Sequence, residues 1–439
     1  MATPTSTAAR RSAGLAPVLL TTGGYYGTLA AVRALGRAGV RVVVADSDRL
    51  SVSRWSRFAH ACLRPPDIRD EHDGFLEWLV AFGKKATERH VLLPTCDDTA
   101  WFYARHRETL QRYYHLTSCT LDAFYALLNK KQLMEACRAV GIDIPETRYL
   151  ANESDIARVA EAATFPLLIK PATQILFKSR EKGTIVTKPA AFAAAYGGFR
   201  KLTYTAPLQA FDASVAWPLV QQYIPGAQTN IYNLSGYIGR ENSVFRASVK
   251  ILQAREIGVG ICFERADVDT ALSDAVRALF ERVGYHGIFE IEFIRANDRY
   301  YLIDANPRFY GEMAFEVARG MPLPLFAYFD ALGDVEALRA LVAQAQTLER
   351  ADAPRAHVHR VGFEMFLGTQ RLAGAWSAHQ ERVWRDWRTA QGKRISDAVY
   401  DAEDWLPSVI ETANSVYRQF RYPAELFGRT AHYRLGSTR

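Results

Sequence analysis

The chain has 439 residues, 49% of them hydrophobic, and its formal net charge is +7. This length suits about two to four domains, and the hydrophobic fraction is enough for several packed cores. The charge is too small and too evenly spread to indicate a nucleic-acid partner, and no stretch approaches the ~20 apolar residues of a membrane span.

Neither the cysteine spacing nor the first residues of the sequence indicate a secreted protein. The five cysteines are scattered without a CxxC pair: Cys62, Cys96, Cys119, Cys137 and Cys262. Their spacing argues against a zinc site and a disulfide framework, and it predicts a reducing, cytoplasmic location. Residues 1–16 lack an apolar segment of the signal-peptide kind and are interpreted as a disordered tail.

Residues 17–120 are predicted to form a small doubly wound α/β domain. The run VLLTTGG (18–24), helical spacing over 25–39 and the β-branched run VRVVVADSD (40–48) predict a strand–helix–strand unit with parallel strands. HVLLPTCDD (90–98) predicts another buried strand that ends in acids. Ligands of such sheets gather at the carboxyl ends of the strands.

The glycine loop GGYYG does not carry the dinucleotide-binding fingerprint. It is either a tight strand-to-helix turn or a substrate-facing loop. In the second case Ser53, Arg54, Asp97 and Asp98 would lie on neighbouring loops.

Further elements follow in chain order. Residues 121–139 are predicted to be helical, FPLLIKP (165–171) to be a buried strand, and 218–238 to be two strands joined at a Pro-Gly turn. Residues 285–304 predict a pair of strands, and 331–348 a helix.

The segment FEIEFIRANDRYYLIDANPRFYGE (289–312) carries the strongest chemical signal. Because side chains alternate along a strand, Glu290 and Glu292 share a face, and an antiparallel partner joined by the RANDR turn brings Asp304 near Glu292. Two buried carboxylates repel each other, and a divalent cation relieves that repulsion. The alternative is an ordinary hairpin with solvated acids.

Two residues beyond Asp304 extend this pattern. Carboxylate and amide oxygens suit Mg²⁺, so Asn306 supplies a further ligand on the same face. Arg308 follows with a planar fork suited to phosphate oxygens. The row of acid, amide and guanidinium therefore predicts a metal–phosphate site for phosphoryl transfer.

Lysines and a polar loop support the same hypothesis. Lys170 ends an apolar strand, where an ammonium is costly unless it meets an anion. Lys130 lies on the helix ahead of the GIDIP turn. The loop KSREKGT (178–184), which includes Lys182, could close over phosphates, and QQYIPG offers backbone groups to an adenine edge.

Taken in order, the sequence resembles the ATP-grasp superfamily and, within it, the stand-alone carboxylate–amine ligases. The matching pieces are the α/β domain, NKKQLMEACRAVGIDIPET, FPLLIKP, VQQYIPG, Glu292 and IDANPR, over roughly residues 17–330. The front end, with VRALGRAGVRVVVADSD and SRWSRFA, is similar to the predicted carboligase branch that includes D-aspartate ligase-like enzymes.

The resemblance implies an α/β and α+β fold of several parts. A doubly wound α/β (pre-ATP-grasp) domain at 17–120 would precede a two-lobed ATP-grasp domain at 121–330. The lobes would cover about 121–205 and 206–330. Beyond the resemblance, the helical spacing of 331–348 and the change in composition from about residue 356 predict a mainly helical C-terminal piece at 331–439.

It also implies roles for individual residues. Lys130 and Lys170 would hold the α- and β-phosphates of ATP, and Arg308 would contact the γ-phosphate and an acyl phosphate. The remaining implied contacts are an adenine-reading hinge at Gln221, Gln222, Tyr223 and Ile224, Mg²⁺ or Mn²⁺ ligands at Glu292, Asp304 and Asn306, and basic groups near phosphate or carboxylate at Lys250 and Arg255. The alternative for Lys250 and Arg255 is that they are exposed strand charges.

Two residues depart from the family pattern. Gln221 stands where the family commonly has Glu, which changes the contact to adenine or ribose. Asp304 stands where Glu is usual and is one methylene shorter. Neither change removes the metal-binding logic.

The implied activity is ATP-dependent amide formation through an acyl phosphate, with release of ADP and phosphate. Its substrates would be a small carboxylate and an amine, such as amino acids or their derivatives, and homodimers are common in the superfamily. The alternatives are a bicarbonate-activating or ribosylamine-ligating ATP-grasp enzyme, and a catalytically weak ATP-binding regulatory protein.

From about residue 356 the composition shifts toward tryptophan and arginine. Four tryptophans fall close together among arginines: Trp376, Trp384, Trp387 and Trp405. Aromatic and arginine residues at roughly helical spacing predict a helix packed on the core. Docking on a partner or a membrane surface is the alternative.

Overall fold

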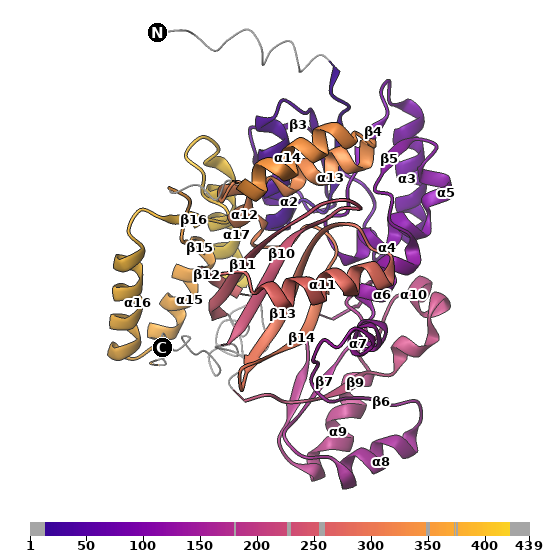
Figure 1. The fold of residues 1–439 in the computed structure, drawn as a ribbon, viewed down its shortest axis with the longest axis vertical. Coiled ribbons are helices and arrows are strands. Elements are labelled where there is room, and N and C mark those ends of the chain that lie inside the picture. The colour runs from indigo at the N-terminus through magenta and orange to yellow at the C-terminus, as the bar shows by residue number, and fades with distance from the viewer. Residues whose placement is uncertain are drawn as a thin grey trace.

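This computed structural model describes residues 14–179, 181–225, 230–253, 260–347, 352–372, 374 and 376–421. Within these ranges no helix is both long enough and apolar enough to cross a lipid bilayer. Three sheets organise the described chain, one in an N-terminal α/β unit and two in the segments that follow (Figure 1).

The N-terminal unit is built on a five-stranded sheet of order β3-β2-β1-β4-β5, in which every neighbouring pair is parallel. The order reverses between β1 and β4, which is where ligands bind in doubly wound sheets. The strands are β1 Val18–Thr21, β2 Val42–Ala45, β3 Ala59–Leu63, β4 His90–Leu92 and β5 Tyr114–Leu116. The helical elements are α2 Tyr26–Arg37, η2 Val52–Trp55, α3 His72–Lys85, α4 Asp97–Arg105 and α5 Arg107–Leu110.

A broken helix links this unit to a small lobe. The helix expected over 121–139 is two helices, α6 (Leu121–Leu128) and α7 (Lys130–Ala139). Asn129 separates them, because its side chain caps α7 by accepting hydrogen bonds from the backbone of Lys131 and Gln132. Lys130 therefore occupies the first position of a helix.

The small lobe is a four-stranded antiparallel sheet of order β6-β9-β7-β8. Figure 1 shows it at one end of the molecule with α8 and α9 beside it. Its elements are β6 Thr147–Tyr149, α8 Glu153–Ala162, β7 Leu167–Lys170, β8 Thr184–Val186, α9 Pro189–Arg200, α10 Ala206–Phe211, η3 Ala213–Ala216 and β9 Leu219–Gln222.

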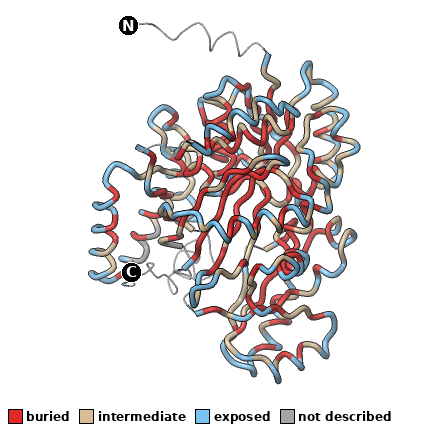
Figure 2. Tube along the Cα trace, viewed as in Figure 1, coloured by how far each residue is buried: buried red, intermediate tan, exposed pale blue. Residues whose placement is uncertain are grey.

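The largest sheet has seven strands in the order β14-β13-β10-β11-β12-β15-β16. Its core strands are buried along most of their length, whereas the outer helices expose one face (Figure 2). The strands up to β14 are β10 Ile231–Ile238, β11 Ser243–Gln253, β12 Gly260–Ala266, β13 Gly287–Ala296 and β14 Arg299–Asn306. The helices are α11 Thr270–Val283, α12 Met313–Ala318, α13 Leu323–Leu332 and α14 Val335–Thr347, so the boundary expected at residue 330 falls inside α13.

The predicted hairpin at 289–304 is present as β13 and β14. Its turn residues Asn297 and Asp298 have φ values of 51° and 56°. Two consecutive left-handed residues make the tight turn that matches the twist of antiparallel strands, and Asn and Asp tolerate it well. The turn sets the pairs from Ala296–Arg299 to Phe293–Leu302, and a register shift between Phe293 and Glu292 then places Glu292 opposite Asp304.

The C-terminal segment adds two strands to this sheet as well as helices. β15 (Ala356–Val358) pairs antiparallel with β12, and β16 (Ile395–Asp397) pairs parallel with β15. The helices are α15 Arg360–Leu372, α16 Ala378–Gln391 and α17 Leu406–Arg421. Trp384 and Trp387 are buried and stack at 5.0 Å, as expected for a helix packed on the core.

A buried ion pair joins this segment to the N-terminal unit. Arg33 of α2 donates from Nε to Asp404 at 2.8 Å, and the two side chains are only 7% and 1% exposed. Ser56 Oγ and the backbone N–H of Arg57 also donate to Asp404, both at 2.7 Å. The C-terminal segment is thus attached to two parts of the fold.

Replacing Asp404 with alanine should lower the free energy of unfolding by about 3–5 kcal/mol, because Arg33 would remain buried without its partner. Asp401→Ala is the matched control, since its pair with Arg37 is partly exposed and worth about 0–1 kcal/mol. Urea denaturation followed by fluorescence measures both variants. Equal destabilisation by the two substitutions would show that the buried pair of Arg33 with Asp404 contributes no more than the partly exposed pair of Arg37 with Asp401.

Candidate active site

The predicted acid and amide side chains lie side by side on the paired strands β13 and β14, at the end of the hairpin away from its turn. Glu292 is the register partner of Asp304, and Glu290 that of Asn306. Asn306 Nδ2 donates to Glu290 Oε2 at 2.5 Å. The alternation read from the sequence thus places four oxygen-bearing side chains on one sheet face.

Three lysines from different elements meet these acids. Lys130 Nζ contacts Asp304 Oδ1 at 2.5 Å, and Lys250 Nζ contacts Glu292 Oε2 at 3.2 Å. Lys170 Nζ donates to the carbonyl of Ile303 at 3.4 Å, next to Asp304. All three lysines are at least nine-tenths buried, so Lys250 is not an exposed strand charge.

The charges at this junction perturb one another strongly. Burial alone would raise the pKa of Asp304, but Lys130 and Lys170 lower it to about 2. Burial and the neighbouring Lys130 lower the pKa of Lys170 to about 7. Lys170 is therefore an ammonium that lacks enough negative charge around it.

Arg308 is fixed by three hydrogen bonds rather than by a surface acid. Its Nε donates to Asp97 Oδ1 at 2.7 Å, its Nη2 to Asn306 Oδ1 at 2.5 Å and its Nη1 to the carbonyl of Phe309 at 2.8 Å. Asp97 lies in the first turn of α4. The guanidinium thus connects the end of β14 to the N-terminal sheet, and it does not pair with Glu312.

The predicted hinge forms the end of β9 and the residues after it. Gln221 is 1% exposed, and its amide donates to Thr147 Oγ1 at 3.0 Å. Its side chain thus bonds within the small lobe, which leaves backbone groups for any contact to a base. Gln222 is exposed, and Ile224 is buried.

Of the other predicted site residues, Lys182 lies on a loop. Lys182 is exposed, and its charge contributes to the pKa values of Lys170 and Asp304. Arg255 falls in 254–259, outside the described residues.

Further acids on the same face carry no role in the sequence prediction. Glu316 of α12 is fully buried, and burial raises its pKa to about 7. Burial and Glu312 raise the pKa of Glu290 well above its usual value. Asn233 of β10 donates to Glu312 Oε1 at 3.1 Å. The polar residues on alternate positions of β10 and β13 are the sequence signal that points to this cluster.

No group of three or more His, Cys, Asp and Glu side chains among the described residues is arranged to hold a metal ion. The predicted set contains only two such side chains, Glu292 and Asp304, with the amide of Asn306. A cation held there would need ligands from outside the protein, which is the habit of Mg²⁺ with phosphate oxygens.

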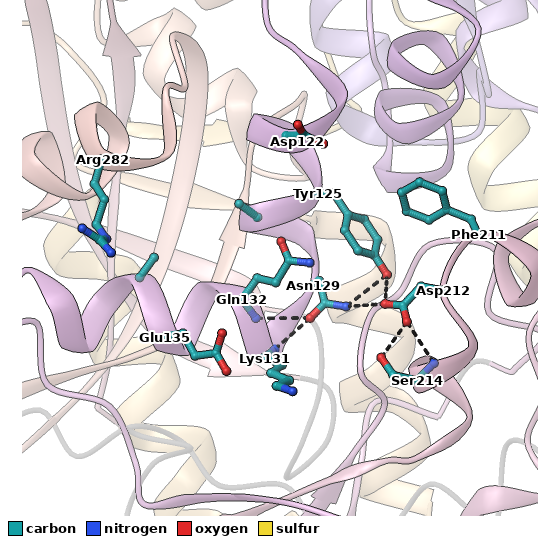
Figure 3. Close-up of a pocket in the computed structure, with 12 residues that line it drawn as sticks. Asp122, Tyr125, Asn129, Lys131, Gln132, Glu135, Phe211, Asp212, Ser214 and Arg282 are labelled. Atoms are coloured by element: carbon teal, nitrogen blue, oxygen red, sulfur yellow. Dashed lines mark hydrogen bonds between the residues drawn. The ribbon is translucent and has the colours of Figure 1, made fainter. Parts of the chain in front are cut away.

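A cavity of about 770 Å³ lies elsewhere, between α6, α7, η3 and α11 (Figure 3). Tyr125 donates to Asp212 at 2.6 Å on its wall, and Asn129 caps α7 there. Lys131 and Arg282 also line it, but none of the predicted site residues does.

No protein-family model matches the sequence, and no curated protein matches it either. Solved structures do match the fold. Biotin carboxylase from Campylobacter jejuni aligns with a TM-score of 0.57 and 15% identity over 74% of this chain and 72% of that one. L-amino acid ligase from Bacillus licheniformis gives 0.57 and 13% over 72% and 74%. N5-carboxyaminoimidazole synthetase from Staphylococcus aureus gives 0.54 and 14% over 72% and 78%.

These solved structures are ATP-grasp enzymes, and the likeness is one of fold. The protein therefore has the ATP-grasp fold, with mixed α/β sheets as the sequence predicted. The site described above is formed by β13 and β14 of the largest sheet together with Lys130 of α7 and Lys170 of β7.

Proposed function

We propose that the protein is an ATP-dependent carboxylate–amine ligase. It would activate a carboxylate with ATP as an acyl phosphate, release ADP, and form an amide when an amine displaces phosphate. One observation carries the proposal: Lys130 contacts Asp304, and Lys170 donates to the adjacent carbonyl of Ile303. Both lysines thus reach the strand that sets Asp304 opposite Glu292 and that leads to Asn306 and Arg308.

The residues fit a magnesium–nucleotide complex. The buried ammonium of Lys170, with its pKa lowered to about 7, is a group that polyphosphate would stabilise. Glu292, Asp304 and Asn306 would hold Mg²⁺, or Mn²⁺, which when bound neutralises phosphate charge. Related folds have been solved with β,γ-ATP, with ADP and with MgADP.

Each side chain would then have a separate task. Lys130 and Lys170 would orient the phosphates, and Arg308 would hold the oxygens on which charge develops, because Asp97 and Asn306 fix its plane. Lys250 would keep Glu292 in place. Such positioning and charge neutralisation supply most of the catalysis in phosphoryl transfer.

The names of the similar structures support a ligase without selecting its substrates. They include an L-amino acid ligase, a phosphoribosylglycinamide synthetase and a biotin carboxylase. A phosphate-release screen of amino acids and small carboxylates in pairs, with product mass spectrometry, tests the proposal. Release that depends on both an acid and an amine is expected.

Other outcomes of that screen would contradict the proposal. Release that depends on bicarbonate would identify a bicarbonate-activating enzyme instead. Tight ATP binding without ADP formation across the screen would identify an ATP-responsive binding protein. D-aspartate is included as a substrate because the front end of the sequence resembles D-aspartate ligase-like enzymes.

The pH dependence of ATP binding should report Lys170. With a pKa of about 7 in the free protein, its amine is mostly neutral at about pH 8. Bound phosphates raise that pKa, so binding takes up a proton, and affinity falls by up to about tenfold per pH unit above 7. Below pH 7 the group is already charged and contributes no dependence.

Calorimetry in buffers of different ionisation enthalpy measures this proton uptake. Lys170→Gln is the comparison, because it should bind ATP more weakly and lose the proton uptake. Equal uptake by wild type and Lys170→Gln would show that another group titrates.

A further inference from the structure

Two neighbouring acids in the first turn of α4 each hold an arginine from a different part of the chain. Asp97 pairs with Arg308 at 2.7 Å, and Asp98 pairs with Arg69 at 2.6 Å. Arg69 follows β3, whereas Arg308 follows β14. Both guanidinium groups therefore contact the start of one helix, which follows β4 at the point where the strand order of the N-terminal sheet reverses.

Arg69 is anchored at one end and open at the other. Its Nε donates to Asp98, which is itself 5% exposed and accepts a hydrogen bond from the backbone N–H of Leu176 at 2.6 Å. Among the described residues, nothing accepts a hydrogen bond from its two terminal nitrogens, and the side chain is 40% exposed. Arg308 differs, because each of its three nitrogens already has one acceptor, although one N–H on each terminal nitrogen remains for a ligand.

Arg69 and Arg308 are held by consecutive residues of one helix turn, Asp98 and Asp97. Burial opposes the charge of Arg69, but Asp98, Tyr25 and Cys96 raise its pKa. Cys96 also acts on the pKa of Arg308. Tyr25, in the glycine loop, is half-exposed. Arg69 therefore lies beside the N-terminal side of the proposed site, because its partner Asp98 adjoins Asp97, the partner of Arg308.

The charges around Arg69 and Arg308 favour a zwitterionic ligand, which carries one positive and one negative group. Two arginines and two aspartates sum to zero, so a second polyanion would gain little from this side of the site. The terminal nitrogens of Arg69 form a fork that matches a carboxylate. One oxygen of Asp97 has no hydrogen-bond donor among the described residues and would accept one from an ammonium.

We propose that Arg69 binds the carboxylate of an α-amino acid that serves as the amine substrate, with the amino group beside Asp97. This inference rests on the proposed ligase function and names the class of its amine substrate. The amino acid would lie against the N-terminal sheet, with its nitrogen toward Arg308 and the phosphate side of the site. Arg69 would thus determine specificity.

The test compares each of the twenty standard amino acids with its carboxamide, in which the carboxylate is replaced by a neutral amide. Wild-type protein should prefer the free acid as amine substrate by roughly 10- to 100-fold in kcat/KM, as expected for a charged hydrogen-bonded pair. Arg69→Gln should reduce that ratio to about one, mainly through KM for the amine. The KM for ATP should stay within about threefold.

Two further variants separate binding from folding. Arg64→Gln is the matched control, since Arg64 lies on the same segment and is exposed, and its side chain donates to the carbonyl of Ser47. This variant should keep the wild-type ratio. Arg69→Lys keeps a cation beside Asp98 but loses the fork, and it should show an intermediate ratio. An unchanged ratio in both Arg69 variants would overturn the inference.

The inference can fail separately from the proposed function. If no acid and amine pair yields phosphate, equilibrium dialysis of radiolabelled amino acids and their carboxamides, with a non-hydrolysable ATP analogue present, replaces the kinetics. Carboxylate-dependent binding that Arg69→Gln abolishes would support the inference while the ligase function fails. Turnover or binding that ignores the carboxylate would overturn the inference alone.

Discussion

Arg308→Ala should lower the rate of acid-dependent ADP formation by roughly 10²–10³, because a preorganised donor to a developing oxyanion is worth about 3–4 kcal/mol. The dissociation constant for ATP should change much less, since Lys130 and Lys170 remain. Arg308→Lys should be nearly as damaging, because an ammonium cannot donate in the fork that Asp97 and Asn306 hold flat. Rates and ATP dissociation constants measured side by side check both expectations.

Arg299→Ala is the control for this experiment. Arg299 begins the same strand but is 57% exposed, and its pair with Asp143 is screened by solvent. It should retain wild-type rates. If Arg308→Ala stays within about threefold of wild type, Arg308 only joins the end of β14 to α4 and takes no part in phosphoryl transfer.

Glu292→Gln should nearly abolish turnover, with a loss of roughly 10³-fold or more, because a charged metal ligand contributes several kcal/mol. The fold should persist, since glutamine has the same shape and removes the repulsion from Asp304 across the hairpin. The glutamine oxygen can still accept a hydrogen bond from the buried Lys250, and the carboxylates of Glu290 and Glu312 remain near that ammonium. Turnover is measured over a range of buffered Mg²⁺ concentrations, with thermal unfolding beside it.

Glu241→Gln serves as the matched replacement at an exposed acid, 70% accessible in its pair with Arg339, and should be neutral. Wild-type turnover of Glu292→Gln at every Mg²⁺ concentration would remove Glu292 from the metal site. If turnover is lost and high Mg²⁺ concentrations partly restore it, the substitution has weakened a metal site that includes Glu292.

The hairpin that carries the site could be predicted from the sequence because its information is local. Alternation places Glu290 with Glu292 and Asp304 with Asn306, and the Asn-Asp turn pairs the two strands. The turn register alone would set Glu292 opposite Ile303, and the register shift beside Glu292, which no local pattern indicates, brings Asp304 into that place. The buried position of Lys170 near acidic groups could be predicted for a similar reason, since a lysine that ends an apolar strand needs an anion.

Contacts between distant segments could not be predicted in this way. The pairing of Arg308 with Asp97 depends on how the central sheet meets the N-terminal unit, and no local pattern encodes it. The side chain of Gln221 turns to Thr147 because β6 lies beside β9, which is a property of the sheet order. Strands β15 and β16 have three residues each, too few for alternation to be recognised.

The two short C-terminal strands have a consequence for any shortened form of the protein. Because β15 covers one side of β12, ending the chain near residue 355 would leave the N–H and C=O groups of β12 exposed along a sheet edge. Such an edge recruits strands from other chains. A protein cut there should self-associate through β12. If the shortened form sediments, with or without lipid vesicles, the sedimentation would report strand pairing between chains and would say nothing about membrane binding by the C-terminal helices.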